Sequence, residues 1–123
     1  MENIVEKKVN DFCAYLQKEA AASKEESDRL MAAGHSDDAN LEKIRGNIPG
    51  IFEALVKAAA RGAETVEQLQ ERFPKKAEQI MTTWRLHCAI ARRNGDTQAC
   101  VIEEIKLQKA DELLAAFARE MEA

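Results

Sequence analysis

Apolar residues recur along most of this sequence at steps of three and four, the spacing that puts side chains on one face of an α-helix. The densest such run is GNIPGIFEALVKAAA, at residues 46–60. Within it, Ile48, Phe52 and Val56 fall on a single broad face. Because the other helices must bury apolar faces of their own, we expect this segment to be the centre of the fold.

The same spacing predicts four main helices separated by short connections. Their expected ranges are about 3–33, 37–61, 74–94 and the stretch after Asp96. A short extra helix is expected between Thr65 and Phe73, ahead of Pro74. Short connections favour antiparallel neighbours, so the predicted fold class is all-α. The predicted architecture is an up-down-up-down four-helix bundle, with residues 1–123 forming one domain.

Two prolines are expected to interrupt this helical pattern, and a third position, Ser23, leaves two alternatives open. Proline removes a backbone donor and crowds the preceding turn, so Pro49 should kink or break the second helix. Pro74 should stop the short helix and serve as the first residue of the third. The first helix either continues through Ser23 or breaks there, with Ser23 capping a second segment and Glu26 completing a capping box.

Composition and charge narrow the functional classes. Few glycines, prolines and aromatic residues are typical of a helical protein rather than a sheet protein. A net charge of −4 disfavours nucleic-acid binding. No signal-peptide pattern is recognised, and no apolar run reaches the ~20 residues of a membrane span, so we expect no membrane partner. Three cysteines without a recognisable spacing favour free thiols in a reducing cytoplasm.

The spacing of the histidines and cysteines does not match a metal site or a catalytic cysteine. Neither His35 nor His87 ends a Glu-x-x-His pair, which a ferritin-like di-iron centre needs. The hairpin expected around Gly95 brings Cys88 and Cys100 to similar heights, where both are expected to be buried, reduced and slow to react. His87 points about 100° away from Cys88 around the helix, which disfavours a joint zinc site or a Cys–His nucleophile.

Paired carboxylates on helices are a further possible site, because they can hold Mg²⁺. All-helical nucleotide pyrophosphohydrolases hold Mg²⁺ with Glu-x-x-Glu on one helix and Glu-x-x-Asp on a later one. Here Glu25-x-x-Asp28 precedes Glu64-x-x-Glu67, which is the reverse order. The sequence therefore predicts no catalytic residue, no cofactor and no metal, and it favours a protein that is not an enzyme.

The first functional hypothesis is a non-catalytic cytoplasmic bundle that acts through protein–protein interaction or self-association. A first helix of 31 residues would be ~46 Å long, whereas a third helix starting at Pro74 would span only ~31 Å. The overhang would carry Leu30 and Met31 past their intrachain partners. These two residues are the predicted interaction surface, and a homodimer is the predicted partner arrangement.

The second hypothesis is a bundle with a small-molecule pocket, with or without catalysis, between the second, third and fourth helices. Phe52, Trp84 and Cys88 are its predicted lining. Such a site needs several polar groups converging on a cavity. The sequence offers no obvious set of such polar groups.

Overall fold

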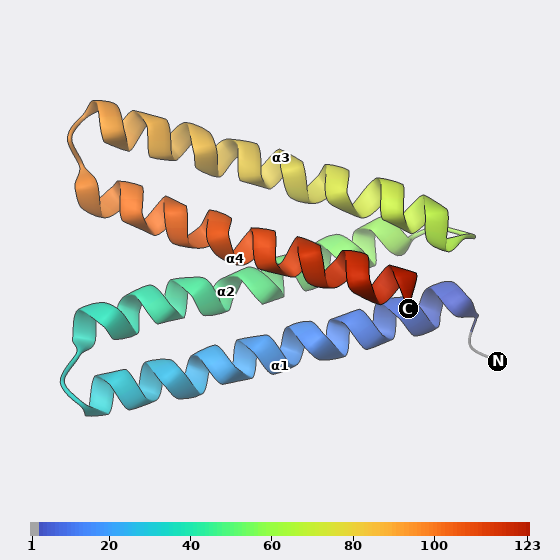
Figure 1. Ribbon diagram of the computed structural model, residues 1–123, viewed down its shortest axis with the longest axis horizontal. Helices are drawn as coiled ribbons and strands as arrows, with labels where there is room; N and C mark the ends of the chain where they lie inside the picture. The colour runs from blue at the N-terminus through green and yellow to red at the C-terminus, as the bar shows by residue number, and fades with distance from the viewer. Residues whose placement is uncertain (1–2) are drawn as a thin grey trace.

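The computed structural model describes residues 3–123 and consists of four helices (Figure 1). They are α1 (Ile4–Ala32), α2 (Ser36–Ala60), α3 (Val66–Arg93) and α4 (Thr97–Glu122). No strand occurs within this part of the chain. The predicted all-α class and the four main helices are confirmed. Across residues 3–123, no helix combines the length and the apolar character needed to cross a membrane.

The helices lie in two pairs (Figure 1). α1 packs along α2, and α3 packs along α4. The turns at 33–35 and 94–96 lie at one end of the molecule, which we call the distal end. The connection at 61–65 and the chain's C-terminus lie toward the opposite, proximal end.

Local capping chemistry explains where three of the helices begin. The side chains of Asn3, Thr65 and Asp96 each accept a hydrogen bond from a backbone N–H in the first turn that follows. Gly95 has φ +71°, a conformation that glycine adopts without steric cost, and it closes α3. Thr65 and Asp96 therefore cap α3 and α4.

The core is centred on the four phenylalanines of the chain, one from each helix: Phe12, Phe52, Phe73 and Phe117. The rings of Phe12 and Phe73 meet edge to face with centroids 5.7 Å apart, and those of Phe52 and Phe73 do so at 5.6 Å. Phe117 lies 4.4 Å from Phe73, centroid to centroid. Phe73 thus contacts a ring from every other helix, which ties the two helix pairs together.

The predicted start of a helix at Pro74, and the short extra helix before it, are wrong. α3 runs unbroken from Val66 to Arg93 with Pro74 in its interior. An interior proline costs ~3 kcal/mol. Leu69 and Phe73, both fully buried, each contribute roughly 1.5–3 kcal/mol by burial. Because these two residues must face the core together, tertiary packing outweighs the local cost of the proline.

The second helix is not broken at Pro49 either. α2 extends from Ser36 to Ala60, and both Pro49 and its neighbour Ile48 are buried. The break was expected from the lost backbone donor, but the flanking apolar face keeps both halves of the helix in place. A kink without a break stays a prediction.

The first helix continues through Ser23, which is buried against α2 rather than capping a new segment. α1 has 29 residues and α3 has 28. The expected length difference, on which the overhang of Leu30 and Met31 rested, is therefore wrong. It failed because the third helix starts eight residues earlier than Pro74 suggested.

The two ends of the molecule are filled differently. Every large apolar side chain that is fully buried lies outside residues 20–47 and 85–104, the two ranges that form the distal part. Within those two distal ranges, the buried side chains are small or polar: Ser23, Ser27, Ala39, Cys88, Ala91, Cys100 and Glu103. The distal end therefore has no core of large apolar residues.

Candidate functional site

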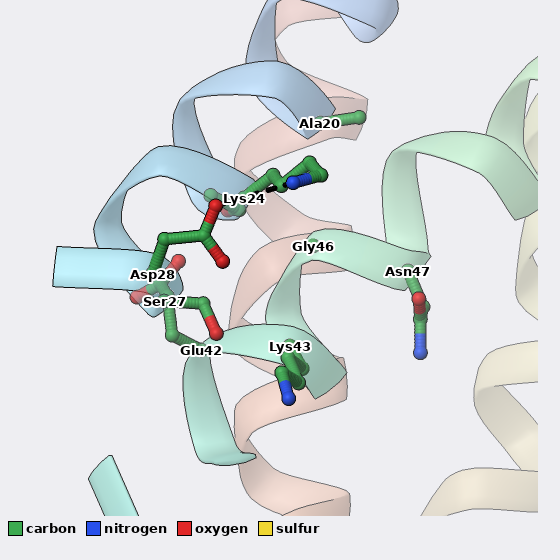
Figure 2. Close-up of a pocket in the computed structure, with 9 residues that line it drawn as sticks. Ala20, Lys24, Ser27, Asp28, Glu42, Lys43, Gly46 and Asn47 are labelled. Carbon is green, nitrogen blue, oxygen red and sulfur yellow. Dashed lines mark hydrogen bonds and ion pairs between the residues drawn. The ribbon is translucent and has the colours of Figure 1, made fainter. Parts of the chain in front are cut away.

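A pocket of about 490 Å³ lies between the distal halves of α1 and α2 (Figure 2). Its floor is made of small residues, among them Ala20, Ser23 and Gly46. Figure 2 shows charged side chains from both helices around it. The complete lining is Ala20, Ser23, Lys24, Ser27, Asp28, Glu42, Lys43, Gly46 and Asn47.

Close helix approach produces this pocket. A Cβ placed on Gly46 would lie only 2.8 Å from the Cβ of Ser23, so α1 and α2 nearly touch at this point. One turn further along α1, the buried hydroxyl of Ser27 donates a hydrogen bond to the carbonyl of Ala39, at 3.1 Å. Small side chains permit the contact, and the space they leave beside it is the pocket.

The charges around the pocket are largely neutralised within each helix. Lys24 bonds to Asp28 at 3.1 Å along α1, and Arg45 bonds to Glu42 at 2.6 Å along α2. Lys24 and Asp28 are exposed, so their attraction is weak and screened by solvent. An open pocket with balanced charges has no strong preference for an anion or a cation. The Ser27 hydroxyl, which is buried beside it, already donates to the Ala39 carbonyl.

A second cluster, at the α3–α4 hairpin, carries more reactive chemistry. Cys88 of α3 and Cys100 of α4 are both buried and free, and their Sγ atoms lie 3.0 Å apart. The Arg92 Nη2 atom lies 3.7 Å from the Cys88 sulfur and 3.6 Å from the Cys100 sulfur. The Cys100 thiol donates to the Glu104 carboxylate at 3.3 Å. We call these four residues the dithiol cluster.

Electrostatics in the cluster favour a protonated Cys100. Its hydrogen bond with Cys88 and its desolvation, followed by the hydrogen bond to Glu104, raise the pKa of Cys100 to about 11, while the Arg92 charge acts in the opposite direction. Arg92 also lies 3.3 Å from Glu104. The guanidinium therefore contacts both sulfurs and the carboxylate at once.

Three of these groups have the chemistry of metal ligands. The sulfurs of Cys88 and Cys100 and a carboxylate oxygen of Glu104 lie within 4.8 Å of one another. A tetrahedral zinc ion takes about four such ligands, so the set is one short. The Arg92 guanidinium lies beside all three, and its positive charge opposes a cation there.

Sequence reasoning placed the two cysteines together but missed Arg92 and Glu104. Each lies four residues after its cysteine, so each falls on the same helix face. That repeated i, i+4 spacing was the available signal. His87 is not among the three clustered ligand groups, and its Nδ1 lies 3.5 Å from the buried Glu103.

The predicted pocket residues do not lie in one cluster. Phe52 and Trp84 belong to the main core, whereas Cys88 belongs to the separate cluster with Ala91 and Cys100. None of the three lines the pocket of Figure 2. A pocket lined by Phe52, Trp84 and Cys88 stays a prediction.

The predicted interaction residues lie at the distal end of α1. Leu30 is half-buried and Met31 is exposed. Two further exposed apolar residues, Leu86 and Ile90, lie one turn apart on α3 and were not singled out from the sequence.

Comparison of the chain with protein-family models, curated proteins and solved structures found no match.

Proposed function

We propose that this chain is a non-catalytic helical protein that works by self-association, as a homodimer joined through its distal end. In this proposal, residues 1–123 form one domain with up-down-up-down helix order, and the axis of α2 bends at Pro49. The three free thiols support a reducing cytoplasmic setting.

The observation that carries the proposal is the uneven filling of the bundle. Large apolar side chains pack at the proximal end, whereas at the distal end Leu86 is 59% exposed and Ile90 is 44% exposed. Met31, also at this end, is 44% exposed. An apolar side chain that moves from water into a packed interface contributes roughly 1.5–3 kcal/mol, so these residues would stabilise an association.

A second copy of the same chain is the partner that fits this surface most simply. In a two-fold dimer Leu86 and Ile90 of one copy meet the same residues of the other, so apolar residues meet apolar residues without any further requirement. Leu86 and Ile90 are four residues apart on α3 and so share one face, which suits helix-against-helix contact. Binding of a different protein at this surface is the competing outcome.

Charge substitution on the two ends of the molecule tests the proposal. Leu86→Glu should reduce the dimer to monomer, because a buried unpaired carboxylate is costly. Ile4→Glu is the matched control: Ile4 is 56% exposed but lies at the proximal end. Sedimentation velocity should show a smaller species for Leu86→Glu and an unchanged one for Ile4→Glu. Equal behaviour of both variants would contradict the proposed surface.

A further inference from the structure

The dithiol cluster is a feature that self-association leaves unexplained. The two sulfurs are 3.0 Å apart, about 1 Å more than the ~2.05 Å bond of a disulfide. They come from the two arms of one hairpin, on helices that pack along each other. A small approach of α3 to α4 brings them to bonding distance. Two thiols that act only as small core residues have no need of this geometry.

The polar neighbours of the sulfurs match the needs of thiol oxidation. A thiolate is the nucleophile in this chemistry, and a guanidinium beside a sulfur favours the thiolate form. The Arg92 guanidinium lies 3.7 Å from the Cys88 sulfur and 3.6 Å from the Cys100 sulfur, so its charge faces both. The Glu104 carboxylate, 3.3 Å from the Cys100 sulfur, is placed to receive the Cys100 proton. Arg92 therefore stabilises negative charge on the sulfur that attacks, and Glu104 accepts the proton that Cys100 gives up.

We propose that Cys88 and Cys100 form a reversible intrachain disulfide when the protein meets hydrogen peroxide, so that the α3–α4 hairpin holds a peroxide-reactive dithiol site. Both sulfurs are largely buried, so the site admits a small oxidant and slows bulky thiol reagents. The expected slow reaction with thiol reagents and the proposed oxidation are thus compatible.

The reaction balances in two steps. The Cys88 thiol gives up its proton and the thiolate attacks one peroxide oxygen. The O–O bond breaks, and the departing hydroxide takes the proton that Cys88 lost to become water, which leaves a sulfenic acid on Cys88. Cys100 then passes its proton to Glu104 and attacks the Cys88 sulfur. The S–O bond breaks, and the leaving hydroxide takes the proton from Glu104 as a second water. Two electrons have moved from the two thiols to the peroxide.

A metal ion is the competing occupant of the same residues. The three ligand atoms lie close enough together, but Arg92 places a positive charge within 3.7 Å of both sulfurs and 3.3 Å of Glu104. A cation bound there would first have to displace that guanidinium. The geometry favours thiol chemistry over metal binding.

Thiol counting on the full chain tests the proposal. The reduced protein, freed of reductant, is treated with hydrogen peroxide, and free thiols are then titrated under denaturing conditions. The count should fall from three to one, with Cys13 surviving, and dithiothreitol should restore all three. A non-reducing peptide map should show Cys88 joined to Cys100. Three surviving thiols, or a bond between two chains or to Cys13, would overturn the proposal.

Three variants sharpen the test. Cys13→Ser is the matched control and should still lose two thiols. Glu104→Gln should slow disulfide closure by roughly tenfold or more, because proton transfer from Cys100 loses its acceptor. The Cys88 sulfenic acid should then accumulate and be trapped by dimedone. In Cys100→Ser no disulfide should form, and circular dichroism reports whether that variant is folded. If it is unfolded, the peptide map of the wild-type chain decides.

A zinc titration tests whether the dithiol cluster binds a metal ion instead. Isothermal titration of the reduced chain with Zn²⁺ should show no binding that depends on Cys88, Cys100 and Glu104. Tight equimolar binding lost in Cys100→Ser would overturn the dithiol proposal and assign the cluster to a metal.

Discussion

Gly46 of α2 lies directly against Ser23 of α1, so close that a Cβ on residue 46 would be 2.8 Å from the Ser23 Cβ. Real Cβ contacts do not reach this distance, and neither atom can rotate away. At this point the two helices can pack only because residue 46 is glycine. The pocket of Figure 2 lies beside this contact.

Gly46→Ala should therefore destabilise the protein by ~1–3 kcal/mol, which is typical of overpacking in a close contact. Gly50→Ala is the matched control on the same helix, because a Cβ there meets nothing within 4 Å. It should stabilise the protein by up to ~1 kcal/mol through helix propensity. Urea unfolding of both variants measures the difference, and similar stabilities would show that the helices do not pack this closely.

Truncation of Phe52 should cost more stability than truncation of Leu55, three residues later on α2. Phe52 is fully buried, so Phe52→Ala should lower the free energy of unfolding by ~3–5 kcal/mol. Leu55 packs against the same core but is only half-buried, so Leu55→Ala should cost less. Chemical denaturation gives both values. Losses under ~1 kcal/mol for both would place α2 at the periphery.

A buried lysine links α1 to α4. Lys109 donates to Glu19 at 2.8 Å and to Glu112 at 3.2 Å. Burial alone lowers the pKa of Lys109, but these hydrogen bonds outweigh burial and raise it, so the ammonium stays charged. Lys109→Ala should cost ~1–3 kcal/mol, because Glu19 loses its partner across the helices.

Lys24→Ala provides the matched comparison for that lysine. Lys24 pairs with Asp28 within one helix and at an exposed position. Its removal should change the free energy of unfolding by less than ~0.5 kcal/mol. Thermal unfolding of the two variants side by side tests the difference, and equal losses would show that the α1–α4 link contributes little.

Because the pKa of Cys100 is raised in the folded state, the free energy of unfolding should fall at alkaline pH. The folded pKa, about 11, lies above its ordinary value of 9.0. The folded state therefore favours the protonated thiol, and this contribution is complete below the ordinary value and lost as the pH rises through the folded pKa. Unfolding free energy should fall over that range in the wild type. Cys100→Ser lacks this titration, so the difference between the two curves isolates it, and parallel curves would contradict the shift.

Local signals in the sequence predicted much of the fold. The caps at Thr65 and Asp96 and the buried stripe of α3 follow from short-range spacing, which one segment of chain contains by itself. The inward approach of Cys88 and Cys100 also follows from their spacing around Gly95. That spacing carries no information on what surrounds the two thiols, so the contact of Arg92 with both sulfurs was missed.

The errors at Pro74 and Ser23 came from tertiary contacts, which a short stretch of sequence does not reveal. Pro74 predicted a helix boundary, but Phe73 contacts rings from all three other helices and keeps the chain helical through the proline. Ser23 could have capped a new helix, but Gly46, more than twenty residues later, gives it a buried place within α1. Tertiary packing decided both cases.

The mass of the native chain in solution tests self-association most directly. Light scattering on a size-exclusion peak at micromolar concentration should give twice the chain mass of 13.7 kDa. On dilution that mass should decrease toward the monomer, as expected for a reversible dimer. A mass of 13.7 kDa at every concentration would contradict the proposal that a second copy covers the exposed apolar residues Leu86 and Ile90.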